Sequence, residues 1–86
     1  MHSPHSLTIA RMGQDDLTIL GNRIREKRKS LGLTQEELAA IAEIDRSYIG
    51  GVERGERNVT FTMLGGICVA LQCDIAALTH ELPKTT

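Results

Sequence analysis

A group of polar side chains in the middle of the chain has the chemistry needed to contact nucleic acid. Arg46, Ser47 and Tyr48 open a short helical pattern. A guanidinium can donate two hydrogen bonds to O6 and N7 of one guanine, the commonest base-specific contact in the major groove. We therefore expect Arg46 to read a base, with a phosphate contact or a solvated charge as the alternative. Ser47 is expected to contact a base or a phosphate, and Tyr48 a thymine methyl or a phosphate.

Several neighbouring residues extend this surface. Arg54, Arg57 and Asn58 end and follow the short helix, where a loop would run beside the sugar-phosphate chain. Phosphate contacts from such a loop position a protein without specifying sequence. Gly51 faces outward and is expected to allow close approach of the helix to DNA, although simple tolerance of glycine explains it equally well. Gln35 begins the preceding helix, whose first N–H groups can bind a phosphate.

Apolar spacing and capping residues predict an all-α fold of five helices. Thr34 and Glu37 form a capping box. Asp45, Thr60 and Asp74 are expected to cap the following helices, and Asp15 or Asp16 the first one. The expected helices span residues 16–31, 34–42, 46–54, 60–71 and 74–82. The side chains expected in the core include Leu31, Ile41, Phe61 and Cys68.

Three motifs together resemble a known family. They are Leu33-Thr34-Gln35-Glu36-Glu37-Leu38-Ala39, Asp45-Arg46-Ser47-Tyr48-Ile49 and Val52-Glu53-Arg54-Gly55. On these residues, the region from Leu20 to Leu78 resembles the XRE/Cro-type, lambda-repressor-like DNA-binding domain. With Arg57-Asn58-Val59-Thr60 it is most similar to the short controller proteins of restriction-modification systems. The resemblance implies a compact five-helix domain whose second and third helices form the helix-turn-helix.

The resemblance also implies specific roles for individual residues. Arg28 lies on the inner face of the first helix, where an unpaired charge would be costly. The matching arginine in the family pairs with a glutamate at the position of Glu53. The family's glutamine at the position of Gln35 binds phosphate. Glu43 and Gln72 stand where the family usually has glycine, so a positive φ at either position would cost stability.

The chain carries 86 residues, a formal net charge of −1 and a pI of about 6.3. This mild charge predicts few phosphate contacts per subunit and hence a need for two copies on the DNA. We expect a sequence-specific transcriptional regulator that binds double-stranded DNA as a homodimer on an inverted-repeat operator. Apolar residues beyond the needs of so small a core predict the dimer interface: Leu64, Ile75, Leu78 and Leu82.

Length and composition narrow the other possibilities. The expected domain spans residues 15–82, between a flexible tail at 1–14 and a short tail at 83–86. No set of catalytic side chains, phosphate loop or metal-ligand spacing is present in the sequence, so we expect no enzyme, no cofactor and no metal. We expect a cytoplasmic protein that does not associate with a membrane. The alternative function is a protein-interaction module or antitoxin with the same fold. Besides DNA and a second copy of the chain, RNA polymerase or a toxin is a candidate partner.

Overall fold

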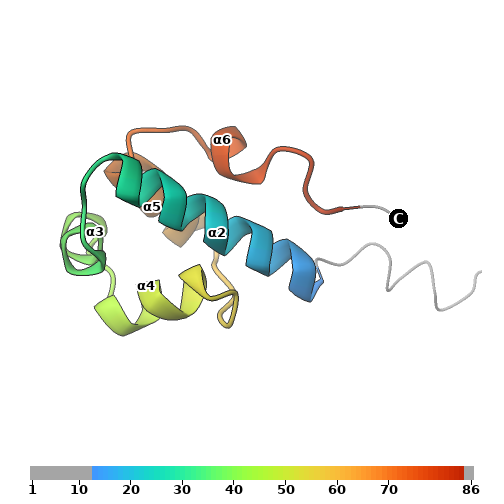
Figure 1. Cartoon of the computed structure of the whole chain (residues 1–86), viewed down its shortest axis with the longest axis horizontal. Helices are drawn as coiled ribbons and strands as arrows, with labels where there is room; N and C mark the ends of the chain where they lie inside the picture. The colour runs from blue at the N-terminus through green and yellow to red at the C-terminus, as the bar shows by residue number, and fades with distance from the viewer. Residues whose placement is uncertain (1–12, 85–86) are drawn as a thin grey trace, which may run out of the picture.

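Five helices follow one another in the computed structural model, which describes residues 13–84 (Figure 1). Every regular element in this part of the chain is a helix, which confirms the predicted fold class. The predicted flexible tail falls outside the described residues, apart from Gly13 and Gln14. None of the helices in the described range is long and apolar enough to cross a membrane. The helices are α2 (Gln14–Ser30), α3 (Gln35–Ala42), α4 (Arg46–Glu53), α5 (Phe61–Ala70) and α6 (Ile75–Thr79).

Four of these helices begin with the predicted capping residues. Thr34 accepts the N–H of Glu37 at 3.0 Å, and the Glu37 carboxylate accepts the N–H of Thr34 at 2.8 Å. Asp45, Thr60 and Asp74 likewise cap α4, α5 and α6 with their side chains. Each cap satisfies a backbone donor that a helix end leaves without an intrahelical partner.

The start of α2 differs from the prediction. Gly13 occupies the N-cap position, and Asp16 lies inside the first turn, where it accepts the Gly13 N–H at 2.9 Å. The same carboxylate accepts the N–H of Lys84 at 2.8 Å. These backbone hydrogen bonds, that of Lys84 first, hold the pKa of Asp16 below its usual value. Asp16 thus ties the segment after α6 to the beginning of α2.

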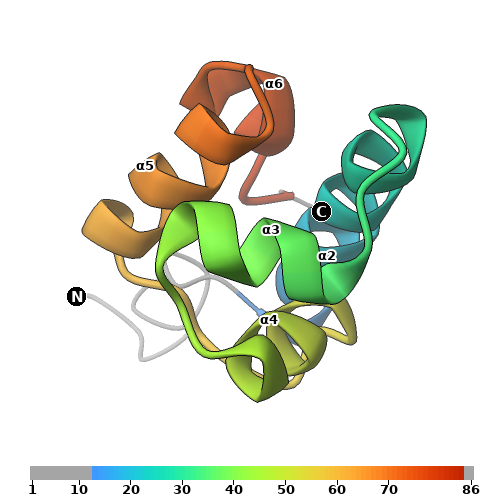
Figure 2. The same ribbon diagram turned by 90° about the vertical axis from the view of Figure 1, so that its left-hand side faces the viewer.

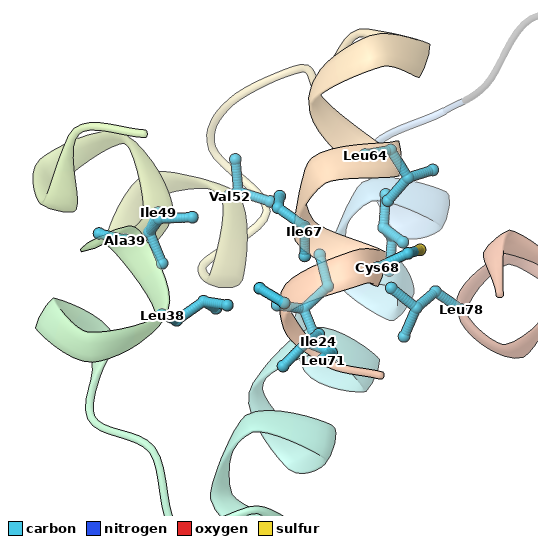
Figure 3. Close-up of a cluster of buried hydrophobic side chains, with 12 residues drawn as sticks. Ile24, Leu38, Ala39, Ile49, Val52, Leu64, Ile67, Cys68, Leu71 and Leu78 are labelled. Atoms are coloured by element: carbon cyan, nitrogen blue, oxygen red, sulfur yellow. The ribbon is translucent and has the colours of Figure 1, made fainter. Parts of the chain in front are cut away.

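The core is aliphatic and draws on all five helices (Figure 3). Its members are Leu20, Ile24, Leu38, Ala39, Ile49, Val52, Leu64, Ile67, Cys68, Ala70, Leu71 and Leu78. Three residues expected in the core are exposed instead: Leu31 at 38%, Ile41 at 55% and Phe61 at 76%. Leu31 follows the last turn of α2, Phe61 is the first residue of α5, and Ile41 lies on a side of α3 that no other described helix covers.

Burial also corrects part of the predicted dimer interface. Leu64 and Leu78 are 6% and 2% exposed and belong to the core of the single chain. Ile75 and Leu82 are half-buried and pack against that core. Leu64 and Leu78 therefore offer a partner molecule little exposed area while the domain remains folded.

A close approach between α2 and α4 fixes the orientation of α4. A Cβ atom at Gly21 would lie 2.4 Å from the carbonyl oxygen of Val52, so a larger residue would push the helices apart. Arg25 donates to the carbonyl of Glu53 at 3.1 Å, and Gln14 donates to the carbonyl of Gly55 at 2.7 Å. Side chains of α2 thus satisfy carbonyl groups at the carboxyl end of α4.

Candidate nucleic-acid interface

The turn between α3 and α4 presents the beginning of α4 at one edge of the molecule (Figure 2). Glu43 ends α3 in the left-handed conformation, with φ of 59°. The N–H of Ile44 then returns to the carbonyl of Ala39 at 3.0 Å. Ile49 is fully buried, whereas Arg46 and Ser47 in the first turn of α4 are exposed to solvent. This is the arrangement in which a second helix can enter a major groove.

Arg46 lies at the exposed start of α4, as expected for a base-reading residue. Its Nε lies 3.4 Å from a carboxylate oxygen of Glu36, and the two side chains are 57% and 68% exposed. An ion pair this exposed contributes little to stability. Arg46 can therefore exchange Glu36 for another hydrogen-bond acceptor at little cost. Glu36 could not be identified from the sequence as a partner of Arg46, because only the crossing of α3 and α4 brings the first turns of these helices together.

Ser47 takes part in the cap of its own helix. Its N–H donates to Asp45 at 3.0 Å, and its hydroxyl donates to the same carboxylate oxygen. The hydrogen bonds from Ser47, that of its side chain first, lower the pKa of Asp45. Ser47 is exposed, so its hydroxyl oxygen remains available as an acceptor.

Tyr48 connects α4 to the loop that follows it. Its ring is half-buried against the core, and its hydroxyl donates to the carbonyl oxygen of Asn58. The guanidinium carbon of Arg57 lies 5.8 Å from the centre of the Tyr48 ring, within the range of a cation–π contact. The structure thus brings three predicted contact residues together, and a tyrosine held in this way is poorly placed to stack on a thymine methyl.

Gly51 lies on the side of α4 away from the core but is not open to solvent. A Cβ atom there would lie 2.6 Å from Cγ of Arg57, so the Arg57 side chain covers this glycine. Arg54 lies over the preceding Gly50 and pairs with Glu56 at 3.1 Å. The expected open face of the helix is therefore lined by two arginine side chains.

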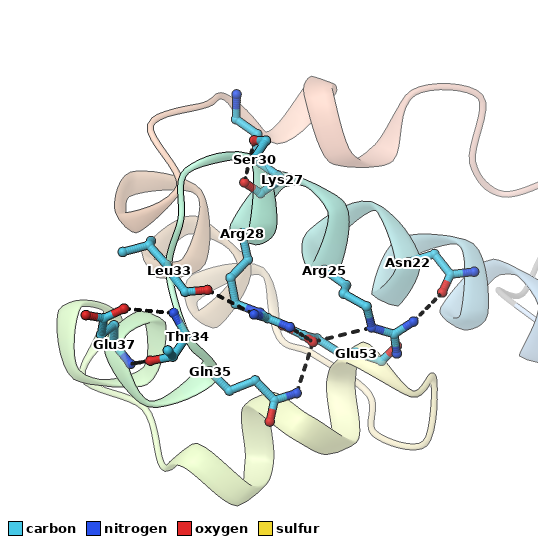
Figure 4. A network of polar contacts seen from close by, with 10 residues as sticks. All are labelled: Asn22, Arg25, Lys27, Arg28, Ser30, Leu33, Thr34, Gln35, Glu37 and Glu53. Atoms are coloured by element: carbon cyan, nitrogen blue, oxygen red, sulfur yellow. Dashed lines mark hydrogen bonds and ion pairs between the residues drawn. The ribbon is translucent and has the colours of Figure 1, made fainter.

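Beneath this surface, a buried carboxylate joins three helices (Figure 4). Glu53 is 1% exposed and accepts two hydrogen bonds from Arg28, at 2.6 Å and 2.9 Å. Gln35 donates to it at 3.0 Å. Burial alone would raise the pKa of Glu53, but the hydrogen bonds from Arg28 and Gln35 outweigh burial and lower it. The ion pair that the resemblance implied is therefore present.

The same network positions the first turn of α3. Gln35, the first residue of α3, is held by Glu53 of α4, while Arg28 also donates to the carbonyl of Leu33 at 2.9 Å. The Gln35 amide nitrogen donates one N–H to Glu53 and retains a second, so the phosphate contact stays a prediction for this second N–H and for the backbone N–H groups of the turn. Arg25, which the sequence analysis did not single out, lies 3.6 Å from Glu53. The sequence signal for this contact is the position of Arg25, a basic residue one helical turn before Arg28.

Comparisons with known proteins agree with this geometry. A family model described as Helix-turn-helix matches residues 24–78. The control protein C.SmaI of Serratia marcescens is 43% identical over 60 residues, which cover 70% of this chain and 71% of that protein. The control protein C.MunI of a Mycoplasma species is 34% identical over 65 residues, covering 74% and 88%. The crystal structure of the restriction-modification controller protein C.AhdI from Aeromonas hydrophila superposes with a TM-score of 0.73 at 45% identity, covering 74% of this chain and 97% of that one.

Proposed function

Because the chain belongs to the helix-turn-helix family of DNA-binding transcription regulators, we propose that it is a restriction-modification controller acting as a homodimer on an inverted-repeat operator. The observation that supports this most strongly is the similarity to C.AhdI, which extends over 97% of that controller protein. The relatives do not favour the alternative of a protein-interaction module. A restriction or methyltransferase gene beside this one would further support the controller assignment.

The contacts that we propose follow from the exposed edge of the molecule. α4 enters the major groove with its first turn, and Arg46 leaves Glu36 to bond a base edge. Exchange is inexpensive because both partners of this ion pair are already solvated. Asn58 and Arg54 lie beside the phosphates, while the N–H groups at the start of α3 bind a phosphate next to Gln35.

Two copies are needed because one short helix offers few base contacts. Two-fold related copies present their recognition helices to half-sites about one helical turn apart, ~34–36 Å. We assign the dimer contact to the outer face of α5, where Phe61 and Val69 are 76% and 79% exposed. Val69 lies on the side of α5 away from the core residues Leu64 and Ile67, and Phe61, the first residue of the helix, lies between that side and the core face. Large exposed apolar side chains in such an arrangement are typical of an interaction surface.

The test compares specific with general DNA binding. A duplex selected from a randomised library and a scrambled duplex of the same composition are each titrated with the protein at several salt concentrations. We expect strong preference for the selected duplex, and weaker binding to both as salt rises. Arg46→Ala should cost ~1–3 kcal/mol per half-site on the selected duplex.

Lys29→Ala is the matched control. It also removes one positive charge, but from an exposed position in the last turn of α2. We expect it to leave the preference for the selected duplex unchanged. Equal binding of the unmodified protein to both duplexes would show that it is not a sequence-specific regulator.

A further inference from the structure

The outward face of α4 has no side chains of its own in the middle of the helix. Gly50 and Gly51 occupy this stretch, yet both are buried. Most of their cover comes from residues later in the chain, although Oε1 of Gln35 would also lie 3.7 Å from a Cβ atom at Gly50. A Cβ atom at Gly50 would lie 3.1 Å from a terminal nitrogen of Arg54, and one at Gly51 would lie 2.6 Å from Cγ of Arg57. The recognition helix therefore carries two arginine side chains laid across it.

The path of Arg57 runs directly over Gly51. Its Cγ, Nε and Cδ atoms would lie 2.6 Å, 3.5 Å and 3.6 Å from a Cβ atom at that position. Its guanidinium then lies 5.8 Å from the ring centre of Tyr48, in the first turn of α4. The hydrogen bond from the Tyr48 hydroxyl to the carbonyl of Asn58 holds the loop in place beside it. The guanidinium of Arg57 thus lies beside the first turn of α4, which is the turn that enters the major groove in the proposed function.

We propose that Arg57 is a specificity-determining residue that reads a base from across α4, and that Gly51 and the Tyr48 ring are its positioning residues. This inference rests on the proposed function, because it requires α4 to enter the major groove. It goes beyond a phosphate contact from the loop, which would leave sequence preference unchanged. A side chain held in place before binding loses less freedom when it binds, which favours a well-defined contact.

The test is a double-mutant cycle of Gly51→Ala, Arg57→Ala and the double variant. Gly51→Ala adds a methyl group where the Arg57 side chain lies. The helix tolerates this change, because alanine is the better helix former and the obstructing atoms belong to a flexible side chain. We expect each single variant to lose about tenfold or more in preference for the selected duplex over its scrambled counterpart, per half-site.

The double variant separates two explanations for the glycine. If Gly51 acts through Arg57, the methyl group has nothing left to displace in the Arg57→Ala background. The double variant should then equal Arg57→Ala. If Gly51 instead allows DNA to approach the helix, the alanine will cause a further loss in the double variant, and this result would overturn its positioning role.

Three further results complete the test. If Arg57→Ala weakens binding to both duplexes by the same factor, Arg57 is a phosphate contact and the proposal is wrong. A lack of preference in the unmodified protein would instead contradict the proposed function itself. In the DNA-free protein, the ring protons of Tyr48, the chain's single tyrosine, should shift in NMR spectra of both single variants. Unchanged Tyr48 signals in both would show that Arg57 is not seated on this ring.

Discussion

At the scale of single residues, Glu53 has the most demanding environment in the described chain. A carboxylate that is 1% exposed must have its charge balanced and its oxygens hydrogen-bonded, since an unpaired buried charge is strongly destabilising. Arg28 supplies both the charge and a two-point hydrogen bond. Gln35 occupies a further acceptor position. This network joins α4, which carries Glu53, to α2 and to the start of α3.

Removing one partner should therefore be far worse than removing both. We expect Arg28→Met to lower the free energy of unfolding by ~3–5 kcal/mol, because Glu53 is left buried without its main counter-charge. Arg28→Met combined with Glu53→Leu should recover most of this loss. Chemical denaturation at neutral pH, followed by circular dichroism, measures all three proteins.

Arg25→Met serves as the control. This side chain also lies near Glu53, at 3.6 Å, but it is 35% exposed, so its removal should cost about 1 kcal/mol or less. If Arg25→Met and Arg28→Met lower the free energy of unfolding equally, burial does not determine the contribution of these ion pairs to stability.

The sequence predicted the environment of a residue correctly where that environment depends only on the face of the helix on which the residue lies. A charged residue on the inner face of a helix requires a partner, and the family resemblance identified Glu53 as the partner of Arg28. The contacts of Arg46 with Glu36 and of Arg57 with Gly51 could not be anticipated. They depend on how two helices cross and on the path of a loop, and neither leaves a periodic trace in the sequence.

At the scale of elements, the ends of α3 and α5 are alike. Glu43 and Gln72 both adopt a left-handed conformation with φ of 59°. Both side chains are exposed, and the hydrogen bonds that end these helices come from the backbone. A residue with a Cβ atom pays ~1–2 kcal/mol for this conformation, whereas glycine does not. The anticipated departure from glycine at both positions is thus a genuine local cost.

Glycine at either position should stabilise the domain. We expect Glu43→Gly and Gln72→Gly each to raise the free energy of unfolding by ~1 kcal/mol. Ala40→Gly is the matched control, because Ala40 is an exposed residue inside α3. Glycine at this position should lower the free energy of unfolding by ~1 kcal/mol. Thermal and urea denaturation report the signs. A loss of stability at all three positions would show that chain flexibility outweighs the relief of strain.

Helix starts were easier to predict than helix faces. Thr34, Asp45, Thr60 and Asp74 have side chains that can accept a hydrogen bond two or three residues ahead, which is a local property. The cap of α2 was assigned wrongly, because Asp16 acts from within the helix and has a second partner in Lys84, far away in sequence.

At the scale of the whole molecule, the exposed face of α5 is the feature that a single domain leaves unexplained. Phe61 was expected in the core because its helical spacing matches that of Leu64 and Cys68, yet it is 76% exposed. Apolar periodicity cannot separate a residue buried in its own domain from one that covers a partner. For the same reason, Leu64 and Leu78 were assigned to the wrong surface.

The proposed dimer makes a direct prediction for Val69. Because Val69 is 79% exposed, Val69→Glu should leave the domain folded but place charge in the interface. We expect sedimentation to show a monomer, and affinity for the full operator to fall by about 10²-fold or more, as paired binding is lost. Asn22→Glu adds the same charge at an exposed position of α2, and this control variant should remain dimeric. An unmodified protein that is monomeric and binds one half-site tightly would contradict the homodimer.

The hydrogen bonds of Asp16 bring Gly13 and Lys84 to one carboxylate. The two ends of the described chain therefore lie close together, and these two hydrogen bonds connect them through Asp16. A short linker between these two residues would join them covalently, and new termini could then be opened in a surface loop without changing the order in which the helices pack. We therefore expect a circularly permuted chain to fold with the same arrangement of its helices.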